Sequence, residues 1–242
     1  MSDAAIVTEW IGLKVGDAVM SAYVARPAEP GEYPGVVVGH EIYGQHATAR
    51  AAVDHLASLG VIAVLPDLFH RVAPRAELEL HVDRERGLEL LRTLTRPGVV
   101  DDVSACLDEL RGRGAVSLNM VGFSAGGHVA YYAATQLPLA ATAAFYPGWL
   151  TNTAIPLSTP EPTVEATPGI TGRVVLFFGG EDPLIDAEAR DELEEALSTA
   201  NIQHEIVVYD DAPHGFLFPG RDWYQPEVAE DSWARLADLL RG

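Results

Sequence analysis

Asn119-Met120-Val121-Gly122-Phe123-Ser124-Ala125-Gly126-Gly127-His128 joins an apolar segment to a helix-compatible one through a Gly-x-Ser-x-Gly turn. Residues 116–123 are typical of a strand buried on both faces, and residues 125–135 are compatible with a helix. A serine on such a sharp strand-to-helix turn has a strained backbone and an outward-facing hydroxyl. Small residues two positions before and after it are needed, because side chains there would strike the neighbouring strand or helix. The stretch therefore predicts Ser124 as a nucleophile at a strand end.

Strand-like and helix-like segments alternate along the chain from residue 35 onward. We expect strands at 35–40, 61–65, 116–123, 140–145, 173–178 and 203–209. We expect helices at 46–59, 76–95, 98–111, 125–135, 186–200 and 226–240, with Pro97-Gly98 dividing the second from the third. Residues 4–11 and 17–25 alternate and predict an antiparallel pair at the sheet edge. The pattern predicts an α/β protein with a mostly parallel central sheet and helices on both faces.

The length of 242 residues suits a single α/β domain, which we place at 1–242. Residues 147–169 contain five prolines, so we expect an irregular excursion there, for which a flap over the site is one role. The single cysteine, Cys106, has no partner for an internal disulfide and falls in a helical pattern. It is therefore interpreted as a small buried apolar residue.

The formal charge of −19 comes from 35 acidic and 16 basic side chains. Such a field repels polyanions, so nucleic acid and anionic membrane surfaces are not expected partners. Residues 114–160 contain no Asp, Glu, Lys or Arg, but polar residues and prolines interrupt the roughly 20 apolar residues that a membrane helix needs. The first residues show no secretory signal. We expect a cytoplasmic protein with a small-molecule partner, and a homodimer stays open.

A serine hydroxyl needs a base to accept its proton and a carboxylate to orient that base. In proteins with this kind of turn, the chain order is serine, acid, histidine. Asp182 follows the predicted strand at 173–178 and is the candidate acid, and His214 follows the last predicted strand and is the candidate base. The alternatives for the acid are Glu181, Asp186, Asp210 and Asp211, of which Asp186 is better explained as a helix N-cap.

Acyl transfer also needs two hydrogen-bond donors for the developing oxyanion. The backbone N–H of Ala125 is one candidate, because it lies at the start of a predicted helix. The second donor is expected from residues 40–44, the loop after the strand at 35–40. Glu41 is an unexpected carboxylate in that loop. The alternative to a functional role is a surface acid that hydrogen-bonds its own loop.

These motifs resemble those of the dienelactone hydrolase family of the α/β-hydrolase fold. The matching segments are His40-Glu41-Ile42-Tyr43-Gly44, Pro66-Asp67-Leu68-Phe69, Gly122-Phe123-Ser124-Ala125-Gly126-Gly127, Gly179-Gly180-Glu181-Asp182 and His214-Gly215-Phe216. The resemblance implies that Glu41 faces the nucleophile and modulates it. It also implies that the Ile42 N–H joins that of Ala125 in the oxyanion hole, and that one or two arginines hold the carboxylate of a dienelactone.

The sequence departs from the family pattern at two places. Ser124 stands where the best-known members carry cysteine. Phe218 stands where an arginine is expected four residues after His214, and the nearest arginine is Arg221. We therefore expect a more apolar ester or lactone than a dienelactone.

Several residues are candidates for contact with the substrate. The second arginine is either Arg84 or Arg86, between which the sequence does not decide. The aromatic candidates for the pocket lining are Tyr43, Tyr146, Phe216 and Phe218. The predicted function is a serine hydrolase that cleaves a carboxylic ester or lactone through an acyl-enzyme and needs no metal or organic cofactor. The alternatives are a peptidase or amidase on the same triad, and a non-catalytic small-molecule receptor with the hydrolase fold.

Overall fold

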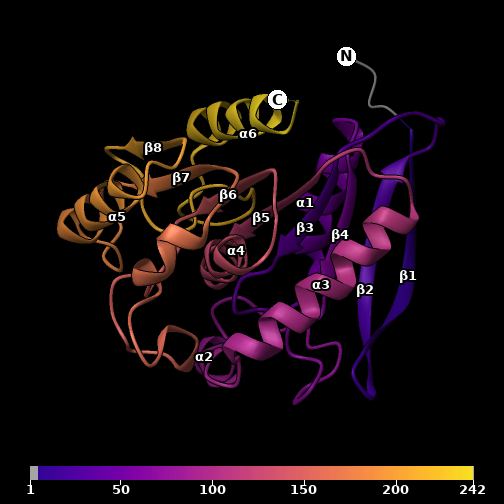
Figure 1. The fold of residues 1–242 in the computed structure, drawn as a ribbon, viewed down its shortest axis with the longest axis horizontal. Helices are drawn as coiled ribbons and strands as arrows, with labels where there is room; N and C mark the ends of the chain where they lie inside the picture. Colours follow the sequence, from indigo (N-terminus) through magenta and orange to yellow (C-terminus); the bar gives the residue numbers. More distant parts are fainter. Residues whose placement is uncertain (1–4, 242) are drawn as a thin grey trace.

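An eight-stranded sheet runs through the computed structural model, which describes residues 5–241 (Figure 1). The strands are β1 (Ile6–Val15), β2 (Ala18–Pro27), β3 (Gly35–Gly39), β4 (Ile62–Pro66), β5 (Leu118–Phe123), β6 (Ala141–Phe145), β7 (Arg173–Gly179) and β8 (His204–Tyr209). Their order across the sheet is β1-β2-β4-β3-β5-β6-β7-β8. β2 pairs antiparallel with β1 and β4, and every pair from β4 to β8 is parallel.

Helices cover both faces of this sheet. They are α1 (Ala47–Ser58), α2 (Arg84–Leu91), α3 (Arg96–Gly112), α4 (Ala125–Gln136), α5 (Ala187–Thr199) and α6 (Pro226–Arg241). α1 and α6 share one face, where the rings of His55 and Trp233 lie 4.6 Å apart. Figure 1 shows α6 and α4 on opposite sides of the strands, and α4 packs on β5 and β6. The α/β architecture predicted from the alternating segments is confirmed.

Burial explains why the sequences of the central strands are mostly unbroken runs of apolar residues. Every residue of β3, β4 and β6 is buried, as expected for parallel strands covered on both faces. Cys106 is fully buried in α3, as its helical pattern predicted, and burial raises the pKa of its thiol well above the usual value. No helix within residues 5–241 is long and apolar enough to cross a membrane.

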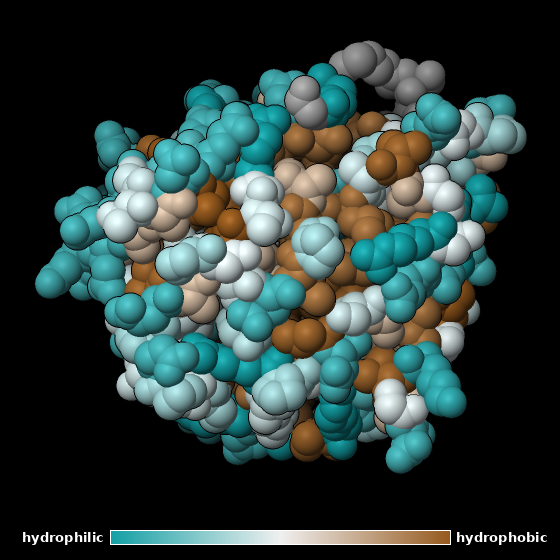
Figure 2. All heavy atoms as spheres, in the orientation of Figure 1, coloured by the Kyte–Doolittle hydropathy of each residue, from teal (hydrophilic) through white to brown (hydrophobic). Residues whose placement is uncertain are grey.

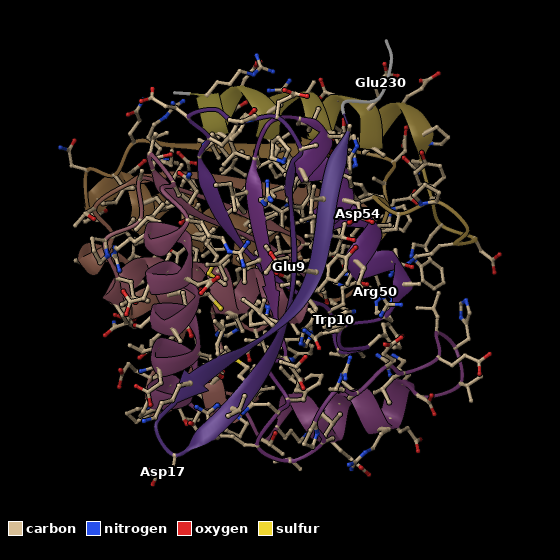
Figure 3. The ribbon with its side chains drawn as sticks, turned by 90° about the vertical axis from the view of Figure 1, so that its right-hand side faces the viewer. Glu9, Trp10, Asp17, Arg50, Asp54 and Glu230 are labelled. Atoms are coloured by element: carbon tan, nitrogen blue, oxygen red, sulfur yellow. The ribbon has the colours of Figure 1, made fainter. Side chains whose placement is uncertain are left out.

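The predicted antiparallel edge pair is formed by β1 and β2 and lies at the front of Figure 3. Asp17 lies at the tip of the hairpin, and Glu9 and Trp10 lie along the outer strand. Beside them, α1 presents Arg50 and Asp54, and the Arg50 guanidinium lies 5.9 Å from the centre of the Trp10 ring. The edge strand therefore carries charged groups, which disfavour unwanted pairing with another strand.

The predicted bounds of two helices were wrong. The helix expected at 76–95 begins only at Arg84, and α3 begins at Arg96, before Pro97-Gly98. Thr95 caps α3, because its side chain accepts a hydrogen bond from the Gly98 N–H at 3.3 Å. Proline fits the first turn of a helix, where its missing N–H has no partner to lose. Pro97 therefore starts a helix here and does not end one.

The proline-rich residues 147–169 follow an irregular path, with two short 3₁₀ turns, η1 (Pro156–Ser158) and η2 (Thr163–Gly169). His128 of α4 holds this excursion, since its ring nitrogens lie 2.8 Å from the Gly148 carbonyl oxygen and 2.8 Å from the Thr163 hydroxyl. Tyr131 adds a hydrogen bond to the Thr167 hydroxyl at 2.5 Å. The excursion is thus fixed to the helix that follows Ser124. Its role as a flap stays a prediction.

The surface in Figure 2 is mixed. Hydrophilic residues form most of the left and lower margins of this face, and hydrophobic residues gather near its centre. On this face, the hydrophobic residues are interrupted by polar ones.

Candidate active site

The backbone at Ser124 has the strained geometry expected of the turn. Its φ is 52° and its ψ is −114°, and it immediately precedes α4. The Ser124 N–H donates to the Phe145 carbonyl at 2.9 Å, which ties the turn to β6. A Cβ on Gly122 would overlap the Gly126 carbonyl, and one on Gly126 would overlap the Gly39 carbonyl. Both glycines are therefore required, because β3, β5 and α4 meet here without room for side chains.

Loops after β7 and β8 bring a carboxylate and an imidazole to this serine. The Ser124 Oγ lies 3.0 Å from His214 Nε2, and His214 Nδ1 lies 2.7 Å from Asp182 Oδ2. The Leu184 N–H donates to the other Asp182 oxygen at 2.9 Å. Because a carboxylate can only accept, Nδ1 carries the proton and Nε2 is free to accept the serine proton. This geometry suits removal of the Ser124 proton by His214.

Tyr146 packs on the His214 ring, and Phe216 packs on Tyr146. The centre of the Tyr146 ring is 4.9 Å from that of the imidazole, and Phe216 packs on Tyr146 at 5.3 Å. Both side chains are fully buried, and neither lines the cavity described below. The expectation that they line a substrate pocket was therefore wrong. Their packing instead limits the rotation of the histidine ring.

The two expected oxyanion donors lie in the right elements. Ala125 is the first residue of α4, and Ile42 follows β3 and lines the cavity. The backbone N–H groups of Ala125 and Ile42 donate no hydrogen bond to any residue from 5 to 241. Both donors are thus available to a ligand, and their role stays a prediction.

A cavity of about 470 Å³ opens over Ser124 and His214. Its other polar and charged lining residues include Glu41, Tyr43, His81, Arg84, Arg221 and Trp223, and its apolar ones include Ile42, Leu88, Trp149, Pro183, Leu184 and Pro213. Sequence reasoning missed His81, Leu88, Trp149 and Trp223, because they come from loops and a short helix without a motif. Among residues 5–241 there is no cluster of three or more His, Cys, Asp or Glu side chains that could bind a metal ion.

Glu41 lines the cavity, but its carboxylate is bound by Arg221 and not by the nucleophile. Arg221 Nη1 donates to Oε1 at 3.0 Å, and Nη2 donates to Oε2. Burial alone would raise the pKa of Glu41, but the Arg221 guanidinium outweighs burial and holds this pKa below its usual value. The alternative of an exposed acid that binds its own loop is wrong, because Glu41 is buried in an ion pair.

The structure also corrects the expected positions of the arginines. Phe218, at the position expected for one of them, turns away from the cavity and packs on Phe123 with ring centres 4.9 Å apart. It lines a separate crevice beside α1 and α6, so its expected contact with the substrate was wrong. Arg221, three residues further on, reaches the cavity instead. Arg221 thus supplies the cation that Phe218 does not.

Arg84 and Arg86 are distinguished by the helix on which they lie. Arg84 begins α2 and lines the cavity. Arg86 points elsewhere and pairs with Glu89, one helical turn away, at 2.8 Å. Residues two positions apart in a helix face different directions. Of the two candidates, Arg84 is therefore the one placed to contact a ligand, together with Tyr43.

Comparisons with known proteins show the family to which the chain is similar. A sequence model of the dienelactone hydrolase family matches residues 20–242. A Synechocystis sp. protein named "Putative carboxymethylenebutenolidase" is 30% identical over 230 residues, covering 92% of this chain and 91% of its own. A Bradyrhizobium sp. protein named "Probable 2-oxo-3-(5-oxofuran-2-ylidene)propanoate lactonase" is 27% identical over 244 residues, covering 100% of this chain and 96% of its own. The crystal structure of a "Putative Dienelactone Hydrolase" from Klebsiella pneumoniae subsp. pneumoniae superimposes with a TM-score of 0.89, at 28% identity, over 98% of this chain and 99% of its own. The chain belongs to the dienelactone hydrolase family.

Proposed function

We propose that this protein is a serine hydrolase that cleaves a carboxylic ester or lactone through an acyl-enzyme. The observation that carries the proposal is the continuous hydrogen-bonded relay from Ser124 Oγ to His214 Nε2 (3.0 Å) and from His214 Nδ1 to Asp182 (2.7 Å). Such a relay converts a weak hydroxyl nucleophile into a reactive one. Membership of the dienelactone hydrolase family and the lactonase name of a relative support the same reaction class.

The proposed reaction has two halves. Ser124 Oγ attacks the carbonyl carbon while its proton passes to His214 Nε2, and the N–H groups of Ala125 and Ile42 bind the oxyanion. The C–O bond then breaks, and the imidazolium gives its proton to the departing alkoxide. Water attacks the acyl-enzyme with His214 again as the base, which releases the acid and restores the serine. With a lactone the alcohol stays attached, so the product is a hydroxy acid.

The charged lining residues point to an anionic substrate. Arg84 and Arg221 both line the cavity, and Arg84 makes no ion pair with any residue from 5 to 241. A substrate carboxylate would find two guanidinium groups near Ser124, and the propanoate in the name of the Bradyrhizobium relative fits this chemistry. The expectation of a more apolar substrate rested on four aromatic residues, of which Tyr43 lines the cavity and Tyr146, Phe216 and Phe218 do not. We therefore favour an ester or lactone that carries a carboxylate.

The same proposal includes a single domain and the cytoplasmic location expected from the sequence. One sheet spans residues 6–209, and the family match covers residues 20–242 without a break, which supports one domain.

Turnover of short p-nitrophenyl esters, simple lactones and a dienelactone tests the function, with Ser124→Ala as the control. We expect the wild type to hydrolyse members of the set and to react with a fluorophosphonate, and the Ser124→Ala protein to do neither. A folded wild type that neither turns over any ester nor takes the label would refute the proposal and favour the receptor alternative. Cleavage of amides at rates comparable to esters would favour the peptidase alternative.

A further inference from the structure

His46, at the start of α1, has a defined tautomer. The Thr48 N–H donates to His46 Nδ1 at 3.2 Å, so that this nitrogen accepts and caps the helix. Burial lowers the pKa of His46 despite the nearby Glu41 carboxylate, so the ring is neutral at neutral pH. A neutral imidazole that accepts at Nδ1 must carry its proton at Nε2. His46 therefore presents an Nε2–H donor.

This donor is buried and makes no hydrogen bond with any residue from 5 to 241. The acceptor it faces is Glu41 Oε2, which lies 4.0 Å from Nε2. A hydrogen bond of this kind spans about 2.7–3.2 Å, so a relative shift of about 1 Å would form it. The His46 Nε2–H thus lies close to a carboxylate that already accepts hydrogen bonds from Arg221.

Arg221, which binds the Glu41 carboxylate, also lines the ligand cavity. Arg221 gives both terminal nitrogens to Glu41 and lines the cavity over Ser124. An anionic group that enters the cavity competes with Glu41 for the same guanidinium. If Arg221 turned to the ligand, Glu41 would be left as a buried charge without a partner, which is strongly unfavourable. Recruitment of Arg221 therefore requires a second donor for Glu41.

We propose that His46 is a positioning residue that takes over the Glu41 carboxylate when Arg221 turns to an anionic group of the substrate. The inference rests on the proposed function and goes beyond it, because it assigns a role to a histidine outside the relay. In the free protein Arg221 holds Glu41. In the complex the His46 Nε2–H donates to Glu41 Oε2, which stabilises the state in which Arg221 binds the substrate carboxylate.

Two substitutions separate this role from helix capping. His46→Asn keeps a side-chain oxygen that can accept from the Thr48 N–H, because asparagine is a preferred N-cap, but it cannot reach Glu41. His46→Gln places an amide N–H near the original Nε2 and loses the cap. We therefore expect His46→Gln to lower the melting temperature by about 2–4 °C and His46→Asn to leave it near the wild-type value.

A pair of esters with acyl chains of equal length reports on Arg221. Mono-p-nitrophenyl succinate carries a free carboxylate, and p-nitrophenyl butyrate does not. In His46→Asn we expect kcat/KM for the succinate ester to fall about tenfold more than for the butyrate ester, mainly through KM. His46→Gln should restore most of the difference, although it is the less stable variant. Equal losses on the two esters in His46→Asn would overturn the inference, because a purely structural defect affects both.

Nitrogen-15 spectra of the histidine rings provide a readout that needs no turnover. In a Ser124→Ala background, the succinate ester should move the His46 Nε2–H signal toward a hydrogen-bonded shift, and the butyrate ester should not. His214 reports occupancy, because its Nε2 faces the same cavity. A succinate ester that moves the His214 signals and leaves that of His46 in place would overturn the inference. An ester set that moves no histidine signal and is not turned over by the wild type contradicts the proposed function itself.

Discussion

Arg221 and Glu41 form a buried ion pair in the wall of the cavity, although 180 positions separate them in the sequence. Their side chains are only 4% and 5% exposed. A pair buried this deeply loses most of its hydration, so each charge depends on the other. The pair therefore links the stability of the loop that carries Arg221 to the chemistry of the site.

Replacing Arg221 alone should be far more damaging than replacing the whole pair. We expect Arg221→Met to lower the free energy of unfolding by about 3–5 kcal/mol, because Glu41 is left as an unpaired buried charge. The double variant Glu41→Met with Arg221→Met should recover at least half of that loss, since two apolar side chains can pack together. Denaturant unfolding of the wild type, the two single variants and the double variant measures the coupling. Additive losses in this cycle would contradict the structure.

The strand-end residues could be predicted from the sequence because the sheet fixes them. Ser124 and Asp182 follow the buried strands β5 and β7, His214 follows the edge strand β8, and parallel strands present their carboxyl ends at one edge. Arg221 could not be placed in this way. The loop that carries it is closed by a hydrogen bond from the Gln225 N–H to the Phe216 carbonyl at 3.0 Å, and its path depends on contacts between distant parts of the chain.

The aromatic residues were misplaced for a related reason. Residue type indicates that Tyr146, Phe216 and Phe218 are large and apolar, but it does not indicate which side of a loop they occupy. The structure buries all three beneath the site or beside it, and the cavity instead receives Trp149 and Trp223 from the same two segments, which follow β6 and β8. The sequence thus predicted the chemistry of the site better than its shape.

Arg84 and Arg86 provide a matched pair of substitutions. Arg84→Met should raise KM for mono-p-nitrophenyl succinate about tenfold, because a guanidinium in the cavity wall no longer contacts the substrate carboxylate. Arg86→Met removes the same charge two residues away and should leave KM unchanged, since Arg86 pairs with Glu89 outside the cavity. Steady-state kinetics on the succinate and butyrate esters measure both. Equal effects of the two substitutions would indicate a general loss of positive charge.

His128 should make the protein less stable in mild acid. Burial lowers the pKa of His128 from 6.5 to about 4, so the unfolded chain takes up a proton between these values and the folded protein does not. Stability should therefore fall as the pH drops from 6.5 to 4, by about 3 kcal/mol from this residue. His128→Asn cannot titrate and should lose less stability between pH 7 and pH 4.5 in urea unfolding.

His40 adds to this loss of stability in acid. Burial also lowers the pKa of His40 to about 4, so it contributes a similar loss over the same pH range. His128→Asn should therefore keep the part of the histidine-linked pH dependence that comes from His40 and from His46, whose pKa burial also lowers. A variant whose stability falls as steeply as that of the wild type would show that His128 is protonated in the folded protein.

Asp182 and Asp186, four residues apart, separate a role in the relay from a role in a helix cap. Asp182→Asn should reduce kcat by about 10³–10⁴-fold, because an amide donor beside Nδ1 favours the tautomer whose Nε2 cannot accept the Ser124 proton. Asp186 instead accepts a hydrogen bond from the Ala189 N–H at 2.9 Å as the N-cap of α5. Asp186→Asn should keep both the cap and the rate, since asparagine caps helices equally well. Rates with p-nitrophenyl butyrate measure the contrast, and circular dichroism checks that both variants are folded. A folded Asp182→Asn enzyme with a rate near that of the wild type would mean that another group orients His214.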